Sequence, residues 1–125
     1  MASYCKLLIL ALASCLSACQ EGGEAGDLFG QWRLAGSDAL YVSFSGSVTL
    51  FRAVGKGQVF GNFQHQGDSL FVQCVSVKGE KRDTAIVEDT FGLKPFTDIR
   101  LKIETLSSDR LQLRKDNQTW SFDKY

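Results

Sequence analysis

Few side chains in this chain of 125 residues could carry out chemistry. Ser69, in the segment Gly67-Asp68-Ser69-Leu70, is a candidate nucleophile, but a catalytic serine needs a histidine base within hydrogen-bond reach. The single histidine, His65, lies four residues upstream, on the far side of a predicted turn. One histidine also cannot supply the three or four convergent ligands of a metal site. We therefore expect no catalytic residues, no metal site and no cofactor, and predict that the protein is not an enzyme.

The cysteine at position 19 has a more informative setting. Leu16-Ser17-Ala18-Cys19 ends a segment in which Lys6 is the only charge and residues 7–13 are apolar. This is the layout of a secretory signal, and the apolar run is shorter than the roughly 20 residues of a spanning helix. Residues 16–19 resemble the lipobox of bacterial lipoproteins. The resemblance implies that residues 1–18 are a lipoprotein signal peptide and that the Cys19 thiol carries the lipid; an ordinary signal peptide cut near Ala18 is the alternative.

A lipidated Cys19 would anchor the protein in the cell envelope of a Gram-negative bacterium, with the membrane as its partner. Residues 20–27 contain three glycines, three acidic residues and no large apolar side chain. Such a segment cannot bury enough surface to order itself, so we interpret residues 19–27 as the lipidated cysteine and a flexible tether. Acidic residues after the cysteine resemble the signals of some outer-membrane lipoproteins, which predicts the outer membrane, on either its periplasmic or its surface face.

Without residues 1–18 the chain has 107 residues, which suits one domain, and we place that domain at residues 28–125. Removal of Lys6 with the signal leaves 13 basic and 14 acidic side chains, a net charge of −1. Without a basic excess to hold phosphates, nucleic acid is not expected as a partner. Cys74 has no second cysteine to pair with inside this domain, and it shares the phase of its apolar neighbours, so we expect a buried small apolar side chain.

From residue 28 onward, apolar and polar residues alternate, which predicts half-buried antiparallel strands. Ile99–Glu104 is the clearest run, and short turns such as Ser45-Gly46-Ser47 separate about eight runs in sequential order. We predict an all-β fold, a small antiparallel up-and-down β-barrel, because closure removes unpaired edges. A two-sheet sandwich is the alternative. The inward residues are expected to be Trp32, Val42, Phe44, Leu50, Phe63, Leu70, Val72, Leu101, Ile103, Leu111, Leu113, Trp120 and Phe122.

Residues 78–98 interrupt the alternation. Asp83 or the threonine after it could cap a short helix, Val87 and Phe91 share a helical face, and Gly92 followed by a proline would end it. We predict a crossover with one short helix that lies across one mouth of the barrel. The apolar residues at its centre would also suit a strand.

Gly30-Gln31-Trp32 resembles the Gly-x-Trp of lipocalins. Together with the C-terminal pattern that contains Arg114, Trp120 and Phe122, it resembles the small lipocalin-like lipoproteins of Gram-negative bacteria, over nearly the whole mature chain. The resemblance implies a calycin-type barrel whose floor contains Gly30, Trp32, Arg114 and Trp120. It also implies that Arg114, or Arg110, covers the Trp32 ring. For Trp32 itself, we expect core packing rather than contact with a ligand.

Two functions remain. In the first, a small apolar ligand enters the mouth below the crossover and contacts Val87 and Phe91, while Lys56 on the opposite rim pairs with a carboxylate head group. In the second, the barrel is filled and does not bind, since eight strands leave room only for side chains or one small molecule. The protein would then be a cell-surface interaction or inhibitor module. Outward-facing aromatic residues, expected to be Tyr41, Phe51, Phe60 and Phe71, would meet the protein partner.

Overall fold

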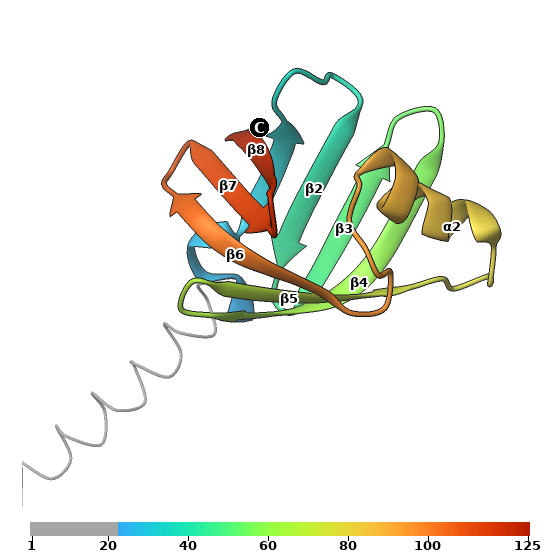
Figure 1. Ribbon diagram of the computed structural model, residues 1–125, viewed down its shortest axis with the longest axis horizontal. Helices are drawn as coiled ribbons and strands as arrows, with labels where there is room; N and C mark the ends of the chain where they lie inside the picture. The colour runs from blue at the N-terminus through green and yellow to red at the C-terminus, as the bar shows by residue number, and fades with distance from the viewer. Residues whose placement is uncertain (1–22) are drawn as a thin grey trace, which may run out of the picture.

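The computed structural model describes residues 23–125 and shows eight strands closed into one barrel (Figure 1). The strands are β1 Gly30–Leu34, β2 Leu40–Ser45, β3 Val48–Ala53, β4 Gly57–Gln66, β5 Ser69–Val75, β6 Ile99–Leu106, β7 Arg110–Lys115 and β8 Gln118–Lys124. Each strand pairs antiparallel with the next in the chain, and β1 closes the barrel on β8. The predicted all-β up-and-down barrel is confirmed, and the sandwich is not what forms.

Alternation along the strands builds the core. In β6, Ile99, Leu101 and Ile103 are buried while the charged residues between them are exposed. A strand places successive side chains on opposite faces, so one face of each strand fills the barrel. All the residues expected to point inward are buried except Leu50, which is half-buried on the outer face.

Leu50 and Phe51 are exchanged relative to the expectation, because β3 runs in the opposite phase. Phe51 is only 3% exposed and points into the barrel. It pairs with Val42 of β2 and with Val59 of β4, both of which are buried. With apolar residues on both of its faces, β3 does not specify its own phase, and its neighbours impose the register.

One end of the barrel, here called the floor, is closed by the 3₁₀ turn η1, Gly23–Leu28. Ala25 and Leu28 are fully buried there. The interpretation of residues 19–27 as a flexible tether is therefore wrong from Gly23 onward, because burial of Ala25 fixes this part on the barrel. The proposed signal peptide and Cys19 lie outside the described residues.

The opposite end is covered by the crossover between β5 and β6, which contains the helix α2, Lys81–Ala85, and the π-type turn η2, Ile86–Thr90 (Figure 1). The single short helix and its end before Gly92 are confirmed, but the expected N-cap is wrong. The residue that precedes α2 is Glu80, whereas Asp83 lies inside the helix. The Asp83 carboxylate is buried and accepts a hydrogen bond of 2.7 Å from Ser76 Oγ, so it ties the helix to the end of β5.

Candidate functional site

Trp32 lies at the centre of the floor and is fully buried. Its Nε1 donates a hydrogen bond of 2.9 Å to the carbonyl oxygen of Leu28, which joins η1 to the barrel. Lys124 Nζ lies 4.5 Å from the centre of the Trp32 ring and also donates to the Phe29 carbonyl oxygen. Gly30 has a φ of +117°, and a Cβ there would come within 2.5 Å of Lys124 Nζ. The glycine thus leaves room for the lysine that covers the tryptophan.

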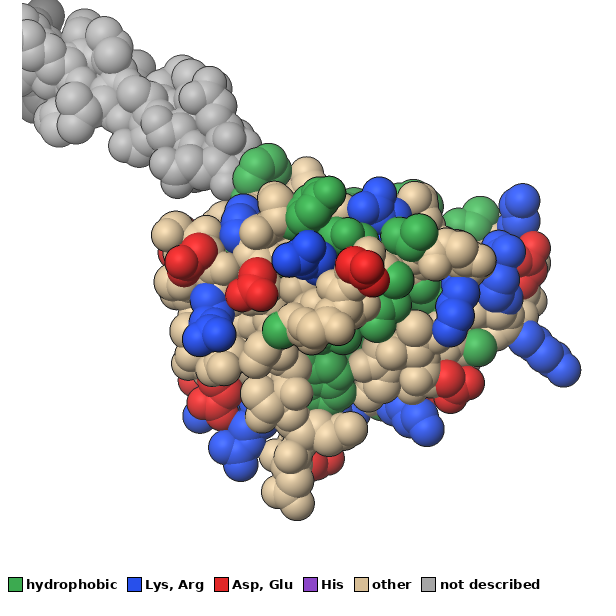
Figure 2. Space-filling view, turned by 90° about the horizontal axis from the view of Figure 1, so that it is seen from above, with side chains coloured by type: hydrophobic (Ala, Val, Ile, Leu, Met, Phe, Trp, Pro, Cys, Tyr) green, Lys and Arg blue, Asp and Glu red, His purple; other side chains and the backbone are tan. Residues whose placement is uncertain are grey.

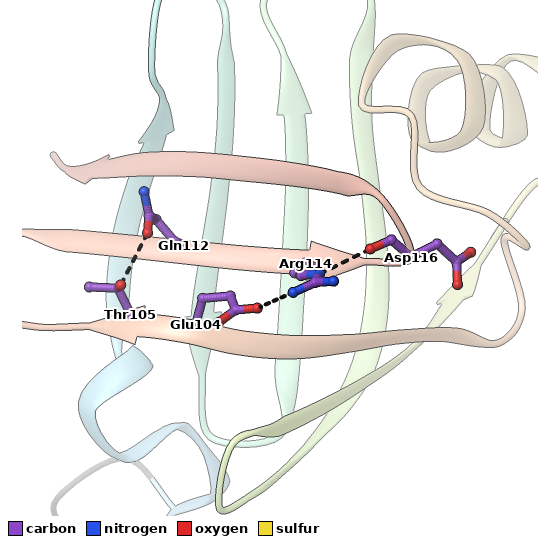
Figure 3. A network of polar contacts seen from close by, with 5 residues as sticks. All are labelled: Glu104, Thr105, Gln112, Arg114 and Asp116. Carbon is purple, nitrogen blue, oxygen red and sulfur yellow. Dashed lines mark hydrogen bonds and ion pairs between the residues drawn. The ribbon is translucent and has the colours of Figure 1, made fainter.

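Arg114 does not contribute to the floor. Figure 3 shows its side chain on the outer face of β7, between Glu104 and Asp116. The guanidinium donates to Glu104 Oε1 at 3.3 Å and to the Asp116 carbonyl oxygen at 3.0 Å. Arg110 is exposed as well. The expectation that an arginine covers Trp32 is wrong, because both residues fall on the outward phase of β7 while Lys124 falls on the inward phase of β8.

Trp120 also lies away from the floor. It occupies the opposite end of β8, where Nε1 donates a hydrogen bond of 2.7 Å to the carbonyl oxygen of Phe91 in the crossover. The floor assignment of Trp120 is therefore wrong, and this residue supports the covered end. The two tryptophans each fix one non-strand segment to one end of the barrel through a buried N–H.

The segment Lys81–Phe91, which we call the cap, carries the two residues expected to contact a ligand. Val87 is fully buried and Phe91 is 3% exposed. The Phe91 ring packs edge-to-face on Phe51, with ring centres 5.2 Å apart. Neither side chain lines an open mouth, because both fill it.

Lys56 lies on the rim, in the turn between β3 and β4, but directly beside the cap and not on the opposite side of the mouth as expected. Its Nζ donates a hydrogen bond of 3.3 Å to Thr90 Oγ1 at an exposed position. Gly55, Asp89 and Arg82 line a shallow hollow around the same place. Lys56 and the two buried cap residues thus belong to one region, although only Lys56 is accessible from solvent.

Ser69 and Cys74, the side chains that could act as nucleophiles, lie elsewhere in the barrel. Ser69 opens β5 directly after the turn at Gly67. The His65 ring lies with Nε2 at 3.0 Å from the Gly67 carbonyl oxygen and Nδ1 at 3.3 Å from that of Ala25, so it links η1 to this turn. Burial raises the pKa of the Cys74 thiol to about 12, which keeps it protonated and unreactive.

Across residues 23–125, no three His, Cys, Asp or Glu side chains gather as a metal site. The helices of this same part of the chain are all too short or too polar to cross a membrane.

Sequence reasoning missed Lys124 and the docking of η1. Lys124 shares the inward phase of Trp120 and Phe122, and a single charged residue on an apolar face was the available signal. For η1 the signal was weaker, because only Ala25 and Leu28 are apolar in a segment rich in glycine and acid.

Comparisons with known proteins agree with this geometry. The family described as "Lipocalin-like domain" matches residues 14–125. A lipocalin-like protein from Bacteroides uniformis has a similar structure, with a TM-score of 0.66 and 20% identity, covering 80% of this chain and 100% of its own. An uncharacterized protein from Bacteroides eggerthii has a TM-score of 0.62 and 18% identity, covering 78% and 99%. No curated protein matches the chain. The family match spans most of the sequence, and the chain therefore belongs to the lipocalin-like domain family.

Proposed function

We propose that this protein is a lipid-anchored lipocalin-like protein of the Gram-negative cell envelope, attached to the outer membrane, which binds a small apolar ligand at the cap end of its barrel. The observation that supports the binding role is that the mouth of the barrel is filled by apolar side chains from outside the sheet. These side chains are Val87 and Phe91, and both belong to the cap. Apolar side chains that occupy a mouth from outside the wall can be exchanged for an apolar ligand without breaking a strand pair.

The contacts of the cap make this exchange feasible. Three side-chain hydrogen bonds join the cap to the barrel: Trp120 donates to the Phe91 carbonyl, Lys56 donates to Thr90, and Ser76 at the end of β5 donates to Asp83. Exposing Val87 and Phe91 would cost about 3–6 kcal/mol at 1.5–3 kcal/mol per side chain. A buried methylene contributes about 0.8 kcal/mol, so an acyl chain of roughly eight carbons offsets this cost. Lys56, freed from Thr90, would pair with the carboxylate of such a chain.

Fluorescence can test the binding role, because Trp120 contacts the cap while Trp32 lies at the floor. Titration of fatty acids from eight to sixteen carbons should give a saturable change that survives in Trp32→Phe and is lost in Trp120→Phe. Phe91→Ala, which empties part of the mouth, should bind more tightly than wild type. Phe60→Ala on the outer wall is the matched control and should bind as wild type does. Absence of a saturable change at every chain length, in wild type and Phe91→Ala alike, would refute the ligand.

The anchor has its own test. The lipobox resemblance of residues 16–19 supports lipidation at Cys19, and several acyl chains on one residue would make the membrane attachment stable. Cys19→Ala should abolish both palmitate labelling and recovery in the membrane fraction. A mutant that still labels and sediments with membranes would contradict the anchor.

The second candidate is an interaction or inhibitor module with a filled barrel, and the closed cap is the observation that favours it. Its expected contact surface is smaller than the sequence indicated. Phe51 is inside the barrel, and Tyr41 is 7% exposed beneath Arg52 and Tyr125. Native mass spectrometry of the lipid-free domain distinguishes the two functions, since bound lipid supports the first and a captured protein supports the second.

A further inference from the structure

One flank of the barrel carries most of the exposed apolar surface of residues 23–125. Seven large hydrophobic residues are exposed in this part of the chain. Five of them lie just before β1, on the outer face of β3 to β5 or just after β5, and the other two are Val54 in the turn after β3 and Tyr125 after β8. With the half-buried Leu50 the five form what we call the anchor-side flank. Its residues are Phe29, Val48, Leu50, Phe60, Val75 and Val77.

Strand register makes this flank continuous. Leu50 pairs with Phe60, and Phe60 pairs with Val75, so one apolar row crosses β3, β4 and β5. Directly opposed residues have Cβ atoms about 4.5–5.5 Å apart, close enough for side chains to touch. Val48 lies two residues before Leu50 on the same face, and Val77 lies two residues beyond Val75. Phe29, 53% exposed, precedes β1 at the floor.

Charge separates this flank from the other side of the barrel. β3, β4 and β5 contain no acidic residue, whereas β6 and β8 contain Glu104 and Asp123. Beyond Val77, Lys78, Lys81 and Arg82 follow, and the one carboxylate among them, Glu80, is paired with Arg82 at 3.0 Å. Figure 2 shows hydrophobic side chains along the edge between the start of the described chain and a corner rich in Lys and Arg.

The distance to the proposed anchor is short. Only three residues, 20–22, separate Cys19 from Gly23, where the turn against the floor begins. Four extended residue steps reach at most about 14 Å. An acylated Cys19 would therefore hold the barrel against the bilayer surface, and the floor turn leads directly to Phe29.

We infer that the anchor-side flank lies on the phospholipid surface into which the acyl chains of Cys19 insert. The apolar row contacts the headgroup–acyl boundary, and Lys78 and Lys81 meet anionic headgroups at the far end. This inference rests on the proposed lipidation. It also deepens the ligand role, because the cap that contains Arg82 then lies at the headgroup level. An apolar ligand could pass from the membrane to the mouth without crossing water.

The test uses the full lipoprotein, reconstituted in vesicles of phosphatidylethanolamine with a minor share of phosphatidylglycerol. Phe60→Cys on the flank and Thr119→Cys on the opposite wall are each labelled with a nitrobenzoxadiazole dye, while the buried Cys74 stays unlabelled. Dithionite added outside should reduce the Phe60 label about tenfold more slowly than the Thr119 label, because lipid covers the flank. Gln73→Cys, a polar position on the same flank, serves if Phe60→Cys fails to fold. An insertion of twelve Gly-Ser residues after Glu21 should remove the difference.

Equal reduction rates in a chain that incorporates palmitate would overturn the inference and leave the anchor intact. Failure to incorporate palmitate would refute the anchor and the inference with it. Protection of the flank label that persists in detergent without vesicles, and disappears on dilution, would show that a second copy of the chain covers the flank and would likewise overturn the inference.

Discussion

Truncation of Trp32 is the most demanding test of the floor. Large-to-small replacement of a buried tryptophan costs about 3–5 kcal/mol, and loss of its N–H leaves the buried Leu28 carbonyl without this donor, a further 1–3 kcal/mol. These terms overlap, so we expect Trp32→Ala to lose about 4–6 kcal/mol. A domain of this size has a total of roughly 5–15 kcal/mol. The variant should therefore lose roughly a third or more of this total and unfold at a clearly lower urea concentration than wild type.

The assay is urea denaturation followed by circular dichroism, with Trp32→Phe as the milder change and Trp120→Phe as the matched control. Each of these removes one buried N–H, but from a different partner, Leu28 or Phe91. Limited proteolysis should then cut within Gly23–Leu28 in the first variant and within the cap in the second. A Trp32→Ala midpoint equal to that of Ser69→Ala or His65→Ala, each expected to lose less than about 1 kcal/mol, would refute the floor described here.

Three further predictions follow from the same contacts. Lys124→Ala should destabilise by about 1–2 kcal/mol through loss of the Trp32 ring contact, whereas Arg114→Ala, in an exposed ion pair, should cost at most about 0.5 kcal/mol; chemical denaturation compares them directly. Gly30→Ala should lose about 1–3 kcal/mol, because its φ of +117° strains any other residue and the new Cβ meets Lys124, and a stability equal to wild type would contradict that geometry. The Cys74 thiol has an ordinary pKa of 9.0 in the unfolded chain and a pKa of about 12 in the folded protein, so its contribution to the free energy of unfolding is complete below pH 9 and is lost as the pH rises toward 12. Between pH 8 and pH 10 the free energy of unfolding should fall by about 1.4 kcal/mol more in wild type than in Cys74→Ala, and identical pH profiles would count against a buried thiol.

The barrel wall was predictable because it depends on a local property. Alternation in runs such as Ile99–Glu104 and glycine-marked turns indicated both the strands and their sequential pairing. The inward face of β3 was not predictable in this way, because Leu50 and Phe51 are both apolar. Pairing of Phe51 with Val42 and Val59 on the neighbouring strands determines that Phe51 points inward. A phase set by neighbours cannot be read from one strand.

The two ends of the barrel were harder to predict, because their contacts join residues far apart in the sequence. Gly30 and Trp32 pointed to the floor, but the partner over the ring is Lys124, 92 positions after Trp32. The cap residues Val87 and Phe91 were identified as apolar, yet the sequence did not show whether they line the mouth or fill it. The answer depends on how deeply the crossover packs into the end of the barrel, and the hydrogen bond from Trp120 to the Phe91 carbonyl fixes that position.

The closure of β1 on β8 determines how the domain would carry mechanical load. Three residue pairs form this seam, from Trp32↔Lys124 to Leu34↔Phe122, and both chain ends leave it at the floor. Force applied between an N-terminal anchor and the C-terminus would peel β1 from β8 one pair at a time. Force between the anchor and something held at the cap end of the barrel wall would run along the strands and load the pairs of β1 with β2 and β8 together. A pull on that end should therefore need a much higher unfolding force than a pull on the C-terminus. Force spectroscopy with handles at Lys56, in the turn between β3 and β4, and at Tyr125 would measure the two forces.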